Sequence, residues 1–155
     1  MLQQYNVCNE ERWGRIIKQI VLVSHGTMAE GMHHAAKMVF GNLPGVSYLC
    51  LTEEKDIETF RGELRILLEA LNREEPVTVL CDIGGGSPYN TTLELLAEMG
   101  CMDRASIVSG MNLPLLLLVL TAPDNSPETV KHCVEESQGS LHLFEMGQED
   151  GDDEL

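Results

Sequence analysis

The sequence predicts an α/β fold in which helices cover both faces of an open, mainly parallel sheet of flavodoxin-like strand order. Two observations support this three-layer fold. Short apolar runs alternate along the chain with longer segments whose apolar residues recur at helical spacing, which is the pattern of a parallel sheet covered on both sides. The chain also has 155 residues, 43% of them hydrophobic, which suits one domain with a sizeable core.

The predicted elements are separated by turn signals. The first strand is the apolar run at 19–24, and the helix after it, at 28–40, keeps helical spacing until Gly41. A helix at 114–120 is apolar throughout but far shorter than the roughly 20 residues that cross a membrane, so we expect it to be buried. The other predicted elements are strand 46–51, helix 56–72, strand 77–81, helix 88–99, strand 105–109, helix 127–137 and strand 140–145.

The last predicted strand differs from the others in its pairing. Residues 140–145 alternate apolar and polar side chains, as a half-buried edge strand does. Only Gln138 and Gly139 separate this strand from the preceding helix, whereas a parallel crossover needs about a dozen residues. We therefore expect it to run antiparallel at the sheet edge, where unpaired N–H and C=O groups invite pairing with another chain.

One histidine stands where the first strand ends. His25 follows the apolar run at 20–23, and Gly26 and Thr27 lead into the next helix. In open parallel sheets, ligands and reactive groups collect in the crevice at the carboxyl ends of the strands. An imidazole there can act as nucleophile, base or metal ligand, although a single histidine could also merely cap the strand.

A carboxylate and a glycine-rich turn follow the third strand. Asp82 comes directly after the strand at 77–81, and three glycines with Ser87 and Pro88 then open the next helix. Because serine is a favoured N-cap and proline is tolerated at the first helical position, we expect Ser87 to cap this helix. The unpaired N–H groups and positive dipole end of such a helix suit a phosphate. Together with the nearby histidine, these features favour a functional site over a purely structural turn.

Three segments of the chain together resemble the IIA domain of the mannose family of the bacterial phosphoenolpyruvate-dependent sugar phosphotransferase system. They are V-S-H-G-T-M-A-E-G-M at 23–32, D-I-G-G-G-S-P-Y-N at 82–90 and S-G-M-N-L-P at 109–114. Their order and spacing match those of the family. The chain departs from the family pattern at Gly84, where a bulky residue is common and a glycine predicts a looser loop.

The resemblance implies a phosphoryl carrier of sugar uptake. His25 would accept a phosphoryl group from the phosphocarrier protein HPr and donate it to a IIB domain, with the membrane IIC and IID components acting indirectly. Asp82 would hydrogen-bond the imidazole, and Ser87 would lie beside the phosphoryl group. The family also forms homodimers that exchange the last strand. It does not indicate which sugar is transported, because a IIA component contacts proteins and never the sugar.

The chemistry of such a transfer fits these residues without the family name. One imidazole nitrogen attacks while the other keeps its proton, and a carboxylate that accepts this N–H fixes the tautomer and stabilises the cationic ring. We therefore expect Asp82 to hold the Nδ1–H of His25 and Nε2 to carry the phosphoryl group. Donors from Gly85, Gly86 and Ser87 would bind the phosphoryl oxygens, with no metal or cofactor.

Charge and chain organisation limit the partners. The formal net charge is −15, and without the acids of the last seven residues it would still be about −10. Nucleic-acid binding needs a basic patch and is not expected, whereas a basic protein partner would be attracted.

We divide the chain into an N-terminal extension at 1–18, a phosphotransferase domain at 19–146 and an acidic tail at 147–155. We expect the tail to be disordered.

The cysteines and the other histidines are assigned no site. The five cysteines are scattered, with no C-x-x-C pair and no signal peptide, which predicts a reducing, cytoplasmic location. His33 and His34 are consecutive on a helix and point about 100° apart, so they cannot chelate one ion as an i, i+4 pair could. His132 and His142 have no partner in the sequence.

Other function classes are excluded or stay open. The turn at 82–90 lacks the G-K-[ST] of a P-loop and the second glycine of a serine-hydrolase elbow. A phosphoryl donor to dihydroxyacetone kinase also resembles the His25 segment, although that group is not expected to carry the G-G-S-P-Y-N turn. A receiver-like domain phosphorylated on Asp82 would need further carboxylates where this chain has Ser24 and His25. A regulatory domain that uses a phosphohistidine as its signal is the remaining alternative.

Overall fold

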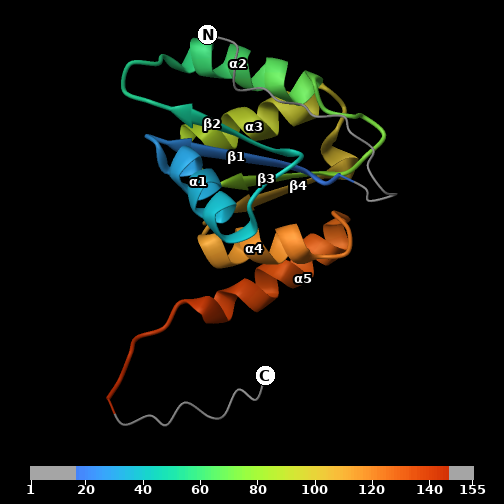
Figure 1. Ribbon diagram of the computed structural model, residues 1–155. Helices are drawn as coiled ribbons and strands as arrows, with labels where there is room; N and C mark the ends of the chain where they lie inside the picture. The colour runs from blue at the N-terminus through green and yellow to red at the C-terminus, as the bar shows by residue number, and fades with distance from the viewer. Residues whose placement is uncertain (1–16, 147–155) are drawn as a thin grey trace.

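Four parallel strands form a single sheet in the computed structural model, which describes residues 17–146 (Figure 1). The strand order is β2-β1-β3-β4, which confirms the predicted α/β fold and flavodoxin-like order. Within the described residues the sheet is wholly parallel. In chain order the elements are β1 (Gln19–His25), α1 (Met28–Phe40), β2 (Val46–Leu51), α2 (Ile57–Glu69), β3 (Val77–Cys81), α3 (Ser87–Glu98), the 3₁₀ helix η1 (Met102–Arg104), β4 (Ala105–Ser109), α4 (Leu113–Thr121), α5 (Pro127–Ser137) and the 3₁₀ helix η2 (Gln138–Ser140).

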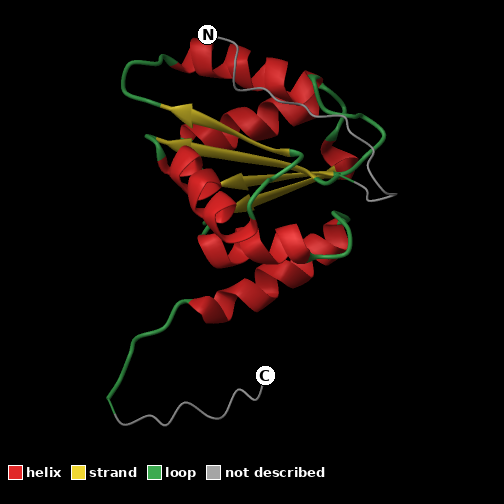
Figure 2. Ribbon diagram, in the orientation of Figure 1, coloured by secondary structure: helices red, strands yellow, loops and turns green. Residues whose placement is uncertain are grey.

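The helices cover the sheet in two layers, as predicted. Helices α2 and α3 lie on one face, and α1 and α4 lie on the other with α5 packed outside α4 (Figure 2). Side chains alternate along a strand, so Val21 and Val23 of β1 join the core beneath α2 and α3, while Ile20 and Leu22 join the core beneath α1 and α4. Strands buried on both faces read as continuous apolar runs, which explains why the central strands were clear from the sequence.

Side-chain caps determine where three of the helices begin. Asp56, Asn112 and Ser126 each accept a hydrogen bond from the backbone N–H three residues further on. The predicted cap of α3 is wrong, because Gly86 holds the N-cap position and Ser87 is already helical. Gly86 has the extended backbone of an N-cap residue, and glycine is tolerated there without a side-chain bond.

A buried polar network ties together the amino-terminal end of the sheet. Asn125 donates from Nδ2 to the carbonyl of Gln19 at 2.9 Å and accepts from the Thr78 hydroxyl. Gln19 in turn donates to the Asn72 carbonyl at 3.0 Å and accepts from the Asn72 backbone N–H at 2.6 Å. These bonds link the starts of β1 and β3 to the loops after α2 and before α5. The carboxyl ends of the strands lie at the opposite end of the sheet.

The predicted strand at 140–145 is not formed within this chain. After α5 and η2, residues 141–146 leave the body of the molecule without pairing to the sheet (Figure 1). Leu141, Leu143 and Phe144 are 92%, 80% and 79% exposed. Within the single chain, Gln138–Ser140 continue the helical path as a 3₁₀ turn and do not reverse it. The exchange of this strand with a partner chain stays a prediction.

Two predicted segments fall largely or wholly outside the described residues. These are the N-terminal extension, of which only residues 17 and 18 are described, and the acidic tail from residue 147. Among residues 17–146, none of the helices is long and apolar enough to cross a membrane. The most apolar one, α4, has 9 residues and buries Leu115, Leu116 and Val119, as expected of a core helix.

Candidate functional site

The carboxyl ends of β1 and β3 bring His25 and Asp82 into direct contact. The two strands are parallel neighbours, with Val23 paired to Cys81, so the residues that follow meet at one edge of the sheet. The ring nitrogen Nδ1 of His25 lies 2.9 Å from Oδ2 of Asp82. The backbone N–H of His25 donates to the same oxygen at 2.9 Å, and the backbone N–H of Ile83 donates to Oδ1 at 2.8 Å. The carboxylate is therefore held by the backbone as well as by the ring.

These hydrogen bonds set the charge of Asp82 and thereby the tautomer of His25. Partial burial raises the pKa of Asp82, but the hydrogen bonds from the His25 backbone, the His25 ring and the Ile83 N–H outweigh it, so the pKa lies below its ordinary value. An ionised carboxylate can only accept hydrogen bonds. The neutral ring must then carry its proton on Nδ1, which leaves the lone pair on Nε2. The His25 side chain is 48% exposed, so solvent and partners can reach it.

The turn after His25 is fixed by contacts that the sequence reasoning missed. The buried hydroxyl of Ser24 accepts the backbone N–H of Ala29 at 2.7 Å, at the start of α1. Gly26 adopts a positive φ of 56° and donates to the carbonyl of Leu51 in β2 at 2.9 Å. Thr27 holds the N-cap position of α1 without a side-chain hydrogen bond, and Ser24 of β1 supplies the acceptor in its place.

The glycine-rich loop presents a mixture of free and occupied N–H groups. Gly85 has a positive φ of 79°, where glycine is favoured. The Gly86 N–H, one of the expected phosphoryl donors, has an acceptor in the Ile83 carbonyl at 3.4 Å. The N–H groups of Gly85 and Ser87 donate to no acceptor in the described part of the chain. The side chain of Asn90, which the sequence analysis did not single out, donates to the Gly85 carbonyl at 2.9 Å and braces the loop.

The third motif packs against the end of β3. The N–H groups of Gly110 and Met111 donate to the carbonyls of Asp82 and Cys81 at 3.1 and 2.9 Å. A Cβ atom added at Gly84 would lie 3.1 Å from the hydroxyl oxygen of Ser109. The Ser109 side chain thus closely borders Gly84. All three motifs therefore converge on the carboxyl end of β3.

The remaining histidines lie elsewhere on the molecule. The ring of His33 in α1 contacts that of Tyr48 in β2, with 5.1 Å between the ring centroids and an angle of 48° between the ring planes. Burial and the neighbouring His34 and Lys37 lower the pKa of His33. His132 is exposed on α5, and His142 is exposed on the segment that leaves the body. Within residues 17–146, no group of three or more histidine, cysteine, aspartate or glutamate side chains is arranged to hold a metal ion.

Comparison with known proteins gives consistent matches over most of the chain. A family model described as the PTS system fructose IIA component matches residues 19–138. The fructose-specific EIIA component of Bacillus subtilis is 30% identical over 102 residues, which cover 66% of this chain and 68% of that protein. The mannose-specific EIIAB component of Escherichia coli is 28% identical over 108 residues, 70% of this chain, and the match spans only 32% of that protein. The chain therefore spans about a third of the EIIAB components that it matches.

A solved structure supports the fold. The mannose/sorbose-specific IIA subunit of the phosphotransferase system from Enterococcus faecalis superposes with a TM-score of 0.72 at 26% sequence identity. The superposition covers 84% of this chain and 97% of that subunit. The parallel sheet and its helices are thus arranged as in a phosphotransferase IIA structure.

Proposed function

Since the chain belongs to the family of IIA components of the sugar phosphotransferase system, we propose that it carries phosphoryl groups on Nε2 of His25. The match to the family model confirms the resemblance that the three motifs indicated. The observation that carries the proposal is the 2.9 Å contact of His25 Nδ1 with Asp82. That contact leaves Nε2 as the nucleophilic atom on a half-exposed ring.

The proposed step is a direct transfer between two proteins. The lone pair of His25 Nε2 forms a bond to phosphorus, and the bond between phosphorus and the donor atom breaks, with its electron pair returning to the donor. The proton on Nδ1 stays in place, and the Asp82 carboxylate stabilises the positive charge that the ring gains. Donation to the next protein reverses the same step, so His25 returns to its neutral form.

The glycine loop supports the transferred group in this proposal. Positioning and preorganised donors dominate catalysis of phosphoryl transfer. The N–H groups of Gly85 and Ser87, which have no acceptor among the described residues, are available at the amino-terminal end of α3. The positive end of the helix dipole adds to their attraction for the phosphoryl oxygens. Gly86 contributes less as a donor, because its N–H is directed to Ile83.

The surface around His25 supports docking of protein partners, which we propose are phospho-HPr as donor and a IIB domain as acceptor. Met28 and Ile83, which follow the two site residues in the chain, are 43% and 58% exposed. The loop after β2 exposes Glu53, Glu54 and Asp56, and β2 reaches the site where Gly26 donates to Leu51. An apolar rim with an acidic edge suits a partner that carries basic residues. The IIC and IID components would be served indirectly through IIB.

Phosphorylation with purified components tests the proposal. Incubation with phosphoenolpyruvate, the general first enzyme of the system and HPr should add one acid-labile, hydroxylamine-resistant phosphate to each chain. Subsequent addition of a IIB domain should remove that phosphate, whereas dihydroxyacetone kinase should not. Rapid loss of the phosphate to neutral hydroxylamine would instead indicate an acyl phosphate on Asp82 and a receiver-like function. That outcome is disfavoured by the three N–H groups that already occupy the Asp82 carboxylate.

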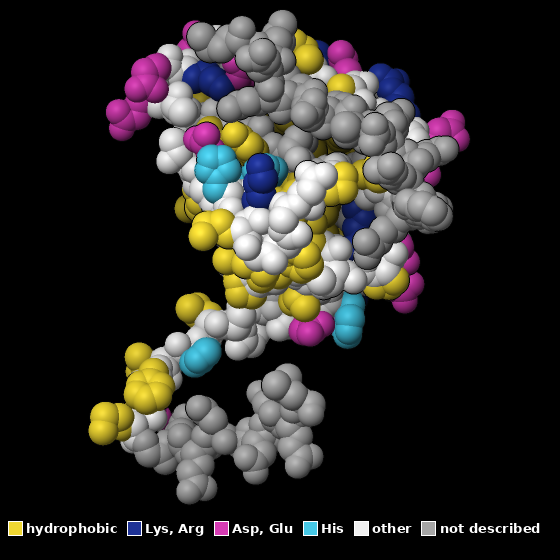
Figure 3. Space-filling view, viewed as in Figure 1, with side chains coloured by type: hydrophobic (Ala, Val, Ile, Leu, Met, Phe, Trp, Pro, Cys, Tyr) yellow, Lys and Arg dark blue, Asp and Glu magenta, His cyan; other side chains and the backbone are white. Residues whose placement is uncertain are grey.

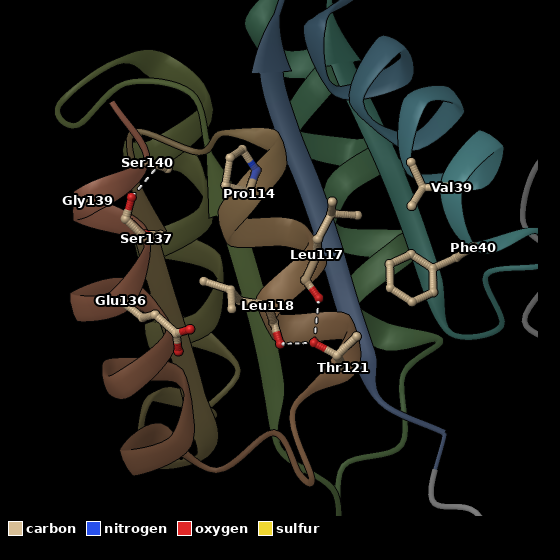
Figure 4. A pocket seen from close by; sticks show the side chains of 10 residues that line it. All are labelled: Val39, Phe40, Pro114, Leu117, Leu118, Thr121, Glu136, Ser137, Gly139 and Ser140. Atoms are coloured by element: carbon tan, nitrogen blue, oxygen red, sulfur yellow. Dashed lines mark hydrogen bonds between the residues drawn. The ribbon is translucent and has the colours of Figure 1, made fainter. Parts of the chain in front are cut away.

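We also propose that the active form is a homodimer in which residues 140–145 cross to the partner sheet. The segment that leaves the body carries apolar side chains that the chain itself leaves uncovered, as Figure 3 shows. An apolar groove between α1, α4 and α5 begins at the same place, with Phe40, Leu117 and Leu118 in its lining and Gly139 and Ser140 at its edge (Figure 4). A second copy would cover both surfaces and supply the antiparallel strand that β4 lacks as an edge strand.

Two truncated chains are expected to show that the dimer depends on residues 140–145 and not on the acidic tail. A chain that ends at Gly139 should be monomeric, because it loses the exchanged strand. A matched chain that ends at Met146 keeps the strand, loses only the acidic tail and should remain dimeric. Light scattering at micromolar concentration measures both. A full-length monomer, or a well-folded dimer that ends at Gly139, would remove the strand from the interface.

A further inference from the structure

The two glycines that precede α3 are required for different physical reasons. At Gly85 the backbone has a φ of +79°, which side chains disfavour, yet an added Cβ atom would meet nothing within 4 Å. At Gly86 the backbone is extended, with φ −74° and ψ 164°, and any residue can adopt it. A Cβ atom at Gly86 would nevertheless lie 2.8 Å from Cε1 of the His25 ring and 2.7 Å from Cγ2 of Ile83. Both separations are shorter than real Cβ contacts, so neighbouring atoms would have to move.

The hydrogen bonds of the loop indicate that the imidazole is the part that would move. The Gly86 carbonyl accepts the Asn90 backbone N–H at 2.9 Å, and the Asn90 side chain holds the preceding carbonyl of Gly85 at 2.9 Å. The Gly86 N–H itself donates to the Ile83 carbonyl. By contrast, the His25 side chain is 48% exposed, and among the described residues only Asp82 forms a hydrogen bond with its ring. The loop is braced, and the ring has open space beside it.

We infer that Gly86 is a positioning residue: the absence of a side chain there lets the His25 ring lie against the loop with Nδ1 on Asp82. A Cβ atom would push Cε1 outward and rotate the ring away from Oδ2. The Nδ1–H tautomer would lose its acceptor, and Nε2 would no longer point in a fixed direction. This role differs from that of a phosphoryl donor, and its consequence for transfer rests on the proposed function of His25.

A pair of matched variants tests the inference. Gly86→Ala should leave the melting temperature nearly unchanged, while the ¹⁵N shifts of the His25 ring move toward a mixture of tautomers. Its rate of phosphoryl transfer should fall about tenfold or more, since small displacements of reacting groups have effects of this size. Gly85→Ala should lower the melting temperature through backbone strain, while the ¹⁵N shifts of the His25 ring stay those of the parent. Ring shifts and a transfer rate in Gly86→Ala equal to those of the parent would overturn the inference, as would equal ring displacement in Gly85→Ala.

A second variant separates the two contacts of the added Cβ atom. In Gly86→Ala combined with Ile83→Ala the clash with Ile83 is gone, but the contact with His25 Cε1 remains. The ring shifts should therefore stay displaced. Their return to the parent values would assign the effect to Ile83 and contradict a direct role of Gly86 on the ring. The ring spectra need no phosphorylation, so they test the positioning role even if His25 proved not to be the phosphorylated residue.

Discussion

Replacement of His25 by alanine is expected to abolish phosphorylation of the chain. The variant loses the only imidazole that contacts Asp82 among the described residues, and with it the nucleophilic Nε2. Incorporation of labelled phosphate from phosphoenolpyruvate, in the presence of the first enzyme and HPr, should fall to background. A control chain in which the exposed His132 of α5 is replaced by alanine should label as the parent does.

The fold of the His25→Ala variant should survive, which makes loss of labelling interpretable. The side chain is half exposed and forms no part of either hydrophobic core. Surface changes of this kind usually alter stability by about 0.5 kcal/mol or less, although here the Asp82 carboxylate also loses one of its donors. Thermal unfolding followed by circular dichroism should show a single transition close to that of the parent. Full labelling of this variant would contradict the assignment of His25.

Most of the fold was predictable because its signals are local. The central strands β1 and β3 are buried on both faces, so they appear as nearly continuous apolar runs. The predicted bounds of β2, β3 and β4 match those observed. The neighbourhood of His25 and Asp82 could be inferred because a flavodoxin-like order places the first strand beside the third, and the carboxyl ends of parallel strands lie at the same edge of the sheet. The 2.9 Å contact between them then follows from the register of β1 and β3.

The features that sequence reasoning missed depend on contacts between distant segments. The bond from Asn90 to Gly85 and the closeness of Gly86 to His25 exist only once the loop has folded against the ring. The sequence predicts Ser87 as the N-cap of this helix, because a serine hydroxyl is the commoner cap, whereas in the structure Gly86 already has the required backbone and the helix begins at Ser87. The alternating pattern at 140–145 indicates that the apolar side chains of this segment become buried. It does not indicate whether they pack against the same chain or against a second copy.

The change Asp82→Asn is expected to slow phosphoryl transfer while leaving the overall fold intact. The carboxylate accepts three N–H groups on two oxygens, two from His25 and one from Ile83. An asparagine of the same shape has one carbonyl oxygen, so its NH₂ group must face at least one of these donors. The amide also cannot offset the charge of the ring during transfer, and we expect a loss of about 10²-fold or more in rate. Rapid-mixing measurements with phospho-HPr provide the rate.

Glu53→Gln is the matched control, because it removes one negative charge from the loop after β2 without touching the hydrogen bonds of the ring. Its transfer rate should stay near that of the parent at moderate salt, where exposed charges are screened.

Asp82 also contributes to the stability of the fold, because its folded pKa lies below the ordinary 3.8. That contribution is present above the unfolded pKa and is lost as the pH falls through the folded pKa. The stability gap between the parent and Asp82→Asn should therefore be full at neutral pH and shrink in acid. A variant that transfers as fast as the parent would show that Asp82 has only a structural role, since the ring would then need neither its charge nor its tautomer fixed.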